Sequence, residues 1–428
     1  MNAIFERLKE TSEFKKACEI LKNEEERTFK EQLELTLIPA FSLHEEKKAL
    51  RFREKLEAEG LKTTLDAVNN VYTVFKGTGD GPTLYVTAHM DTVFPLDTPL
   101  EITEKDGKYY CPGISDDTAS LAQLFGIIRA IKGSGIKFKG NLIIGGNVGE
   151  EGLGDLYGVK HFFLKDHTEG IDGFIAIDGN GTQCFYGGTG SHRYEVTFRG
   201  PGGHSSYDFG MPNPIHAMGR AIAKFADMEV PNDPKTTFSV GVVNGGTSVN
   251  SIPIECTMLV DIRSEEADAL EEADILFHKF MEEAVSEENE RWIRDREKYS
   301  DRFTAKGAIP LCEKAVKLII KQVGDRPAGS QSMDSPIVSA LTVAYNSLGV
   351  EPRYIAHGSL DANIPISLGI PAIGVGCGGK AGGTHSREEW FMPENISEGQ
   401  KRILLLIMGL LGVEGVSDPL LPIMGKRK

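Results

Sequence analysis

Side chains that could hold metal ions stand in five separate stretches of the sequence. They combine imidazoles with carboxylates, the ligand types that zinc and similar divalent ions prefer. A single His-x-Asp motif or acidic pair is most often a surface feature, so the indication comes from their conjunction. The set comprises His89, Asp91, Asp116, Asp117, Glu150, Glu151, Asp178 and His385.

The spacing within these stretches suits a metal site. In the His-x-Asp motif, His89 can bind a metal while Asp91 orients its imidazole through a hydrogen bond. The paired aspartates resist burial together unless cations neutralise them. The paired glutamates can divide their duties, with one carboxylate on a metal and the other free to move protons. One bridging carboxylate and two terminal ligands per ion would complete a two-metal site.

The elements that must position these residues read as alternating strands and helices. Four short apolar runs look like strands buried on both faces, and residues 121–131 have helical spacing. This alternation predicts an α/β fold with a mostly parallel mixed sheet. Ligands of such sheets bind beyond the carboxyl ends of the strands, where most of the candidates lie. The four runs are 84–88, 142–144, 174–177 and 371–375.

The pattern changes near Ser191, where residues 192–199 begin to alternate between polar and apolar. Further strands, a helix and a long acidic helix from residue 265 follow before the first pattern resumes. We therefore expect a smaller α+β domain, residues 191–328, inserted into a catalytic domain formed by residues 1–190 and 329–428. A separate helix is predicted over residues 403–411.

The composition limits the kinds of molecule that the protein is expected to bind. The 428 residues carry a net charge of −15, which argues against nucleic acid because phosphate binding needs basic patches. No run of about 18 apolar residues is present, so we expect no membrane span. Six cysteines lie far apart without a CxxC pair, and no signal-peptide pattern opens the chain. These features favour the cytoplasm and a small or peptidic substrate.

The sequence resembles the M20 family of co-catalytic zinc peptidases and deacylases, which includes peptidase T and carboxypeptidase G2. The resemblance runs from about residue 30 to about residue 415 in the family's order. Its catalytic motifs are AHMDT at 88–92, GISDDTA at 113–119, GEEG at 149–152, IDG at 177–179 and GTHS at 383–386. The inserted domain adds GPGGHS at 200–205, SVNSIP at 248–253 and DIR at 261–263.

The resemblance implies a phosphorylase/hydrolase-like catalytic domain that binds two zinc ions, with cobalt or manganese as possible substitutes. His89, Asp116 and Asp178 would hold one ion. Asp116, Glu151 and His385 would hold the other, which makes Asp116 the bridge. The peptide bond between the paired aspartates would be cis.

The resemblance also implies roles around the metals. Glu150 would be the general base and Asp91 would orient His89. The inserted domain would be a ferredoxin-like lid through which two chains form a homodimer. From it, His204 would reach the partner subunit's active site and stabilise the oxyanion, while Asn250 and Arg263 would bind substrate. Arg263 could grip a carboxylate with two parallel hydrogen bonds.

We accordingly expect a zinc-dependent exopeptidase that cleaves dipeptides and tripeptides with water activated between the metals and Glu150 as base. The alternative is an N-acyl or N-carbamoyl amino acid amidohydrolase with the same metals and a different lid pocket. A non-catalytic dimeric scaffold would have lost ligands, and all are present. The GxGxxG pattern at 374–379 is weak, because it leads to His385 and not into a helix.

Three features depart from the family pattern. Many relatives have lysine after the paired aspartates, whereas this chain has Thr118. Leu360 stands where a small hydroxyl residue is common. The acidic segment 265–298 is longer than the usual lid helix. None of these departures affects a predicted metal ligand, but they leave the substrate open.

Overall fold

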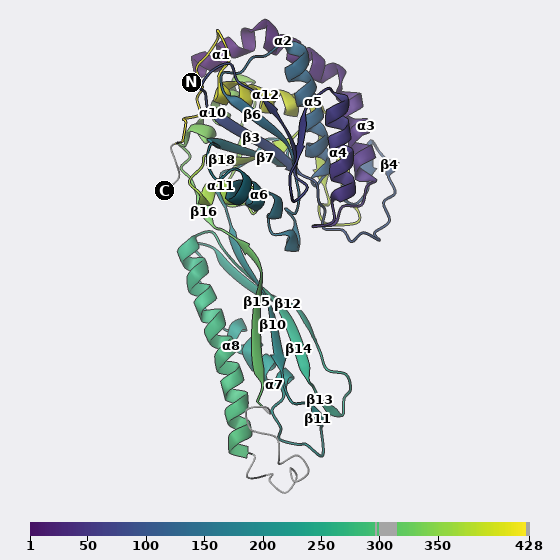
Figure 1. The fold of residues 1–428 in the computed structure, drawn as a ribbon, viewed down its shortest axis with the longest axis vertical. Coiled ribbons are helices and arrows are strands. Elements are labelled where there is room, and N and C mark those ends of the chain that lie inside the picture. Colours follow the sequence, from purple (N-terminus) through teal and green to yellow (C-terminus); the bar gives the residue numbers. More distant parts are fainter. Residues whose placement is uncertain (296–297, 299–314, 425–428) are drawn as a thin grey trace. The chain divides into compact units, whose positions relative to one another are not determined.

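The computed structural model describes residues 1–295, 298 and 315–424. The chain forms two compact units, shown in Figure 1. Unit 1 comprises Met1–Gly188 and Gly329–Lys428, and unit 2 comprises Thr189–Ala328. The chain leaves and re-enters unit 1 through two short antiparallel strands, β9 (Gly187–Gly188) and β16 (Gly329–Ser330).

Unit 1 is built on a central sheet of eight strands. The four middle strands run parallel, because β3 pairs in parallel with β6 and β7, and β7 with β18. Antiparallel pairs join β2 to β6 and β8 to β18, so the sheet is mixed, as predicted. Across the sheet the strands are β1 (Thr63–Leu65), β2 (Val71–Phe75), β6 (Asn141–Asn147), β3 (Thr83–His89), β7 (Gly173–Asn180), β18 (Ala372–Cys377), β8 (Gln183–Phe185) and β17 (Arg353–Ile355).

The middle strands are apolar on both sides because both faces of the sheet are covered. Successive side chains on a strand point to opposite faces. On β3, Val86 joins one core and Tyr85 joins the other. Helix α6 (Tyr157–His161), α11 (Asn363–Ser367) and the turn Phe162–Asp166 contribute to the core with Tyr85. The larger core receives α1 (Asn2–Glu10), α2 (Ser12–Asn23), α3 (Glu25–Thr36), α4 (Glu46–Ala58), α5 (Thr118–Ser134), α10 (Pro336–Ser347) and α12 (Ile396–Leu411).

A small antiparallel sheet of four strands completes unit 1. Its order is β19 (Lys380–Gly382), β20 (Trp390–Met392), β5 (Lys108–Tyr110) and β4 (Thr103–Lys105). The connection between β19 and β20 carries His385, so this sheet fixes one of the predicted ligands.

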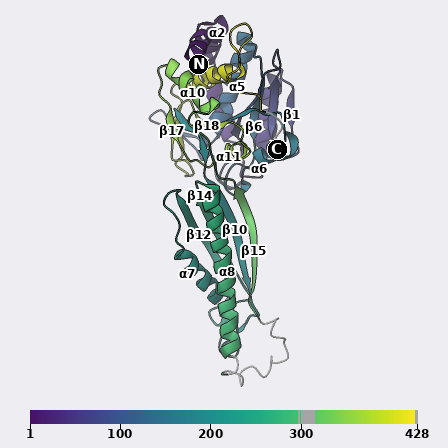
Figure 2. The same ribbon diagram turned by 90° about the vertical axis from the view of Figure 1, so that its left-hand side faces the viewer.

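Unit 2 has the ferredoxin-like order of elements, βαββαβ. Its antiparallel sheet is ordered β12, β14, β10 and β15. Figure 2 shows α8 lying along this sheet, and α7 shares the same core. A separate two-stranded ladder joins β11 (Gly203–His204) to β13 (Ser251–Ile252). The main elements are β10 (Gly190–Arg199), α7 (Pro214–Ala226), β12 (Thr236–Gly245), β14 (Glu255–Ser264), α8 (Ala267–Asp295) and β15 (Lys317–Arg326).

The long helix α8 is held by one apolar stripe on an otherwise charged surface. Its buried residues recur every three or four positions, which keeps them on one side of a helix. The stripe explains how so acidic a segment folds, because most of its carboxylates lie on the other faces, and the buried Glu288 is paired with Arg291 at 2.6 Å. The buried positions are Leu270, Ala273, Phe277, Met281, Ala284, Glu288 and Trp292.

Two sequence predictions differ from the structure. Helix α12 begins at Ile396 and not at residue 403, because the buried side chains of Ile396 and Gln400 add an earlier turn that the apolar run did not reveal. The strands at the margins of the sheets, among them β1, β8 and β17, were not predicted. They are three residues long and too short to show a period.

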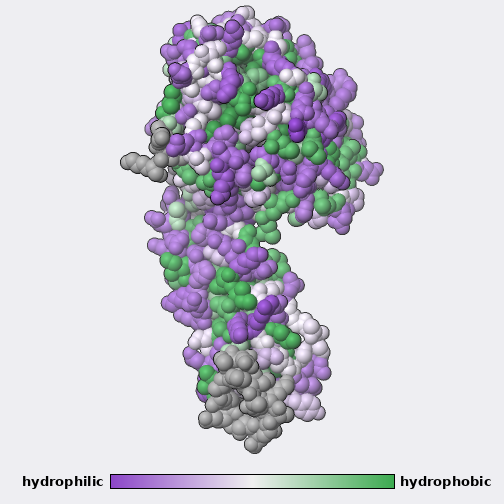
Figure 3. All heavy atoms as spheres, viewed as in Figure 1, coloured by the Kyte–Doolittle hydropathy of each residue, from purple (hydrophilic) through white to green (hydrophobic). Residues whose placement is uncertain are grey.

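No helix in the described part of the chain is long and apolar enough to cross a membrane. Figure 3 shows hydrophilic and hydrophobic residues interspersed over the visible face of the protein. The five cysteines that the structure describes are all free.

Phe277 tests the stripe of α8. The ring is fully buried and stacks on Tyr194 with centroids 4.8 Å apart. Replacing Phe277 with Ala should lower the free energy of unfolding of unit 2 by about 3–5 kcal/mol. Urea unfolding followed by Trp292 fluorescence in a Trp390→Phe background measures this loss. Ile275 on the same helix is 58% exposed, so Ile275→Ala should change stability by less than about 0.5 kcal/mol. Equal effects of the two substitutions would contradict the proposed packing.

Candidate metal centre

Side chains from separate loops converge beyond the carboxyl ends of the parallel strands. His89 is the last residue of β3, and Glu151 lies in the loop after β6. Asp116 lies two residues before the start of α5. One ligand atom from each of these three residues lies within 4.8 Å of the others. The parallel register of β3 and β6 brings about this meeting, because His89 pairs with Asn147 at the same sheet edge.

Asp116 lies between two imidazoles. Its Oδ1 is 3.1 Å from His89 Nε2, and its Oδ2 is 3.2 Å from His385 Nε2. His385 Nε2 is also 2.8 Å from Glu151 Oε1. Each oxygen of one carboxylate thus faces a different imidazole, which is the arrangement that a bridging ligand between two ions requires.

Asp178 lines a cavity of about 170 Å³ at the same place. Burial and the neighbouring Asp116 raise the pKa of Asp178 to about 7. So many acidic groups around one cavity repel each other unless cations enter it. The donor set therefore fits divalent metal ions. The cavity is lined by Asp116, Glu150, Glu151, Asp178, Phe185, Ser359, Leu360 and His385.

The imidazoles show how strongly this site attracts positive charge. Hydrogen bonds to Asp116 and Glu151 raise the pKa of His385 to about 10. Burial disfavours a charged His89, but hydrogen bonds to Asp116 and Asp91 outweigh it and raise its pKa. Burial likewise opposes ionisation of Asp116, and hydrogen bonds from both histidines lower its pKa nevertheless. Metal ions would take the place of these protons, since a ligating imidazole must be neutral.

Asp91 connects one ligand to the loop that carries the paired glutamates. Its Oδ1 lies 3.3 Å from His89 Nδ1 and accepts the Glu150 amide at 2.9 Å. Its Oδ2 accepts the Glu151 amide at 2.8 Å and the Ser42 hydroxyl at 2.6 Å. Burial raises the pKa of Asp91, but these bonds outweigh it and keep the group ionised. Asp91 thus orients His89 and both glutamates together.

Glu389 holds the turn before Asp116. Its fully buried carboxylate accepts the amides of Gly113, Ser115 and Asp116 at 2.7–2.9 Å, and also the Ser115 hydroxyl. The peptide bond between Asp116 and Asp117 is cis, as the family resemblance implied. Sequence analysis missed Glu389, although it follows His385 by four positions. A charged residue near a motif gives no sign that it folds inward.

Of the predicted residues of unit 2, His204 lies in β11, Asn250 directly precedes β13, and Arg263 lies in β14. The ladder places His204 opposite Ser251, and the Ser205 amide donates to the Asn250 carbonyl at 3.0 Å. The side chain of Arg263 on β14 donates through Nε to Asp261 at 2.6 Å. The structure thus brings His204 and Asn250 together, while Arg263 lies on the larger sheet.

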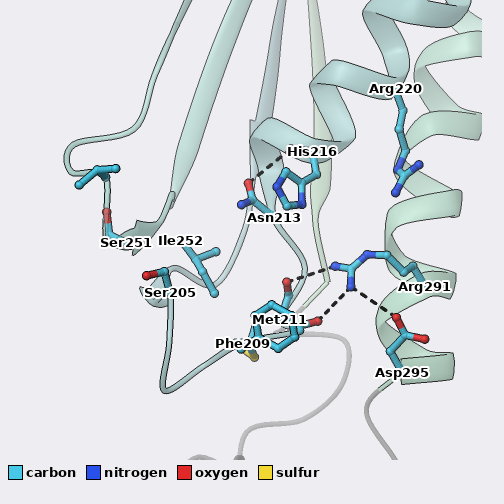
Figure 4. A pocket seen from close by; sticks show the side chains of 12 residues that line it. Ser205, Phe209, Met211, Asn213, His216, Arg220, Ser251, Ile252, Arg291 and Asp295 are labelled. Carbon is cyan, nitrogen blue, oxygen red and sulfur yellow. Dashed lines mark hydrogen bonds and ion pairs between the residues drawn. The ribbon is translucent and has the colours of Figure 1, made fainter. Parts of the chain in front are cut away.

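A second cavity, of about 550 Å³, lies within unit 2 beside this ladder (Figure 4). Ser205 and Ser251, the neighbours of His204 and Asn250, line one side of it. On the other side Arg291 donates to the carbonyls of Gly210 and Met211. No predicted metal ligand lines this cavity.

Comparisons with known proteins agree with this geometry. Residues 85–409 match the sequence model of peptidase family M20/M25/M40. A probable succinyl-diaminopimelate desuccinylase of Staphylococcus aureus is 25% identical over 248 residues, which cover 49% of this chain and 59% of the relative. The enzyme of that name from Bordetella avium is 26% identical over 246 residues, covering 54% and 64%. The matched region therefore spans less than two thirds of these relatives.

Solved structures show the same fold over almost the whole chain. A tripeptidase from Staphylococcus aureus superposes with a TM-score of 0.70 at 23% identity, covering 90% of this chain and 97% of the other. The aminopeptidase PepT from Bacillus cereus gives a TM-score of 0.67 at 21% identity, covering 90% and 98%.

The connecting role of Asp91 can be tested by Asp91→Asn. This change keeps the shape of the side chain but weakens its bonds to His89 and to the two glutamate amides. Zinc affinity should fall about 10- to 100-fold, as when such supporting partners are lost elsewhere. Titration against a competing chelator measures the affinity. Asp97 is exposed on the following loop, and Asp97→Asn should bind zinc as the wild type does. Unchanged affinity in Asp91→Asn would show that Asp91 does not position the ligands.

Proposed function

Because this chain belongs to peptidase family M20/M25/M40, and is therefore a metal-dependent hydrolase, we propose that it is a two-zinc exopeptidase of short peptides. The observation that carries the proposal is the placement of Asp116 between His89 and His385, with further carboxylates around the same cavity. The solved relatives that are named as a tripeptidase and an aminopeptidase support short peptides as the substrate class.

In this proposal His89, Asp116 and Asp178 hold one ion, and Asp116, Glu151 and His385 hold the other. Zinc fits the mixture of imidazole and carboxylate donors, and cobalt or manganese could replace it. When bound, such a pair of ions polarises the scissile carbonyl and makes water a stronger nucleophile.

Glu150 is the proposed general base. Its side chain lines the cavity beside Asp116, and its residue is only 4% exposed. The bond from its amide to Asp91 fixes the backbone from which the carboxylate projects. From there the carboxylate would accept a proton from the attacking water and deliver it to the leaving amine nitrogen. The neighbouring Glu151 is engaged with His385, so the two glutamates divide their duties.

His204 is suited to stabilise an oxyanion. The amides of Ser206 and Tyr207 both donate to its Nδ1, at 3.2 and 3.3 Å. A ring nitrogen that accepts hydrogen bonds carries no proton, so the proton of this imidazole lies on Nε2. Nε2–H is then a donor on an exposed residue. We propose that it acts in the active site of a partner subunit, within a homodimer formed through unit 2.

Arg263 and Asn250 are the proposed substrate-binding residues. Arg263 uses its Nε for Asp261, and its terminal nitrogens make no other hydrogen bond to the described residues. A guanidinium in this state can bind a peptide carboxylate in bidentate fashion. The Asn250 side chain oxygen accepts the Ser248 hydroxyl at 2.6 Å, which directs its amide nitrogen elsewhere. Recognition of a terminal carboxylate would limit cleavage to chain ends.

The second candidate function is hydrolysis of N-acyl or N-carbamoyl amino acids. The two relatives named as desuccinylases favour it. The apolar side chains of Phe185 and Leu360 in the cavity wall would suit an acyl group as well as a peptide side chain. Rates on a tripeptide and on N-acetyl and N-succinyl amino acids separate the two functions. The exopeptidase proposal expects the highest kcat/KM on the peptide, and faster cleavage of the acylated amino acids would overturn it.

Replacing the proposed base tests the mechanism directly. Glu150→Gln keeps size and metal ligands, but it cannot accept the proton. The variant should bind zinc like the wild type and lose turnover by about 10²–10⁴-fold. The measurements are kcat and zinc content. Glu388 is exposed and lies close to His385 in sequence, so Glu388→Gln serves as the control and should retain full activity. Full activity in Glu150→Gln would remove Glu150 as the base.

Mixing two inactive proteins tests the role of His204 across a dimer. In a mixed dimer of Glu150→Gln and His204→Ala subunits, one of the two sites receives an intact Glu150 and an intact His204. After denaturation and joint refolding, activity should return to about a quarter of the wild-type value, because half of the dimers are mixed. Each variant refolded alone is the control. Failure of mixed dimers to regain activity would show that His204 does not act in the partner's site.

A further inference from the structure

Lys48 is a buried cation that the proposed mechanism does not use. It stands in α4, and its residue is only 1% exposed. Among the described residues it is the one lysine with a buried side chain. It lies in register with Phe52 and Leu56 on the inner side of the helix, where an apolar residue would be expected. Such a position needs a compensating reason, because an uncompensated buried charge is costly.

Four buried carboxylates supply that reason, because each interacts electrostatically with the Lys48 ammonium and favours its charged form. Each of the four is at most 3% exposed. The Lys48 ammonium also lies 3.4 Å from the Thr118 hydroxyl. In the described chain no lysine or arginine, Lys48 included, forms a direct ion pair with any of the four, so Lys48 acts on them through its charge at longer range. They are Asp91, Glu45, Glu389 and Asp117.

Each of these carboxylates positions part of the metal centre. Asp91 binds the ring of His89 and the amides of the paired glutamates. Asp117 accepts the backbone amide of His89 at 3.1 Å. Glu389 fixes the turn before the bridging aspartate. Glu45 accepts the amide of Gly149, the residue before the paired glutamates, at 2.9 Å.

These four carboxylates support the proposed ligands without being ligands themselves. Their negative charge therefore requires a separate positive charge. Carboxylates buried together raise one another's pKa, and burial together with Asp91 raises the pKa of Glu45 to about 7. Burial lowers the pKa of Lys48 to about 8, while its four acidic neighbours oppose this change. The ammonium form therefore predominates at neutral pH.

We propose that Lys48 is a positioning residue whose ammonium holds together the carboxylates that orient the metal ligands. The inference rests on the proposed two-metal site. It also accounts for Thr118, which stands in the position after the paired aspartates where many relatives have lysine. In this chain an ammonium comes from α4 instead, because Lys48 Nζ lies 3.4 Å from the Thr118 hydroxyl.

The variant Lys48→Met tests this role, because methionine keeps the apolar packing and removes the charge. The metal-free protein should melt about 5 °C or more below the wild type, since four buried carboxylates lose their cation. With saturating zinc, kcat should fall at least about tenfold, while KM changes less than about threefold because Lys48 does not touch the substrate. Lys47 is exposed on the same helix, so Lys47→Met is the matched control and should leave both quantities unchanged.

Exchanging the two residues relocates the charge. The double variant Lys48→Thr with Thr118→Lys places the ammonium on α5 at nearly constant volume. It should recover at least half of the wild-type kcat and the metal-free melting temperature. Recovery would show that the charge matters and not the lysine's packing. A folded exchange variant as slow as Lys48→Met would overturn the proposal, and this variant carries the test if Lys48→Met does not fold.

These experiments distinguish a failure of the Lys48 proposal from a failure of the proposed two-metal site. Zinc binding to the wild-type protein, measured by calorimetry, tests the metal centre without any variant. The comparison of Lys48→Met with Lys47→Met in metal-free protein tests the charge of Lys48 without any metal. Equal melting temperatures and equal kcat in these two variants would overturn the role of Lys48 even if the wild type binds two zinc ions.

Discussion

Carboxylates buried together at one edge of the central sheet require positive charge, and the organisation of the site follows from this constraint. At about 4 Å, two like charges repel each other by roughly 4 kcal/mol even at an effective dielectric constant of 20. The cavity beside Asp116 gathers Glu150, Glu151 and Asp178, and further acids lie behind it. No fold of this chain could keep so many carboxylates ionised in one place without cations. The imidazoles of His89 and His385 supply positive charge at the cavity, and Lys48 supplies it among the carboxylates that support the site.

The parallel sheet makes this arrangement possible. Its middle strands end at one edge, so loops that are far apart in the sequence deliver their first polar residues to the same volume. Burial on both faces of the strands fixes their positions, and the hydrogen bonds that Asp91 and Glu389 accept from loop amides fix the loops. The proposed ligands are thus held in place by this framework, which would lower the cost of ordering them when a metal binds.

Elements and residues that depend on a local sequence pattern were predictable, whereas residues whose burial depends on packing between distant segments were not. The middle strands were predictable because each is a short apolar run, and the candidate ligands could be proposed because they lie in recognisable motifs, several of them just after those runs. Lys48 and Glu389 were missed, since in the sequence a charged residue in a helix or loop is normally solvated. Only one signal was available: Lys48 shares its helical phase with Phe52 and Leu56. The short marginal strands were missed because three residues show no period.

The most direct test is a crystal structure of the zinc-loaded protein with anomalous data collected at the zinc edge. We expect two peaks flanking the carboxylate of Asp116, one beside His89 and Asp178 and the other beside Glu151 and His385. A map without peaks at these positions, from crystals soaked in saturating zinc, would contradict the account, because the buried carboxylates would then lack the cations on which their arrangement depends.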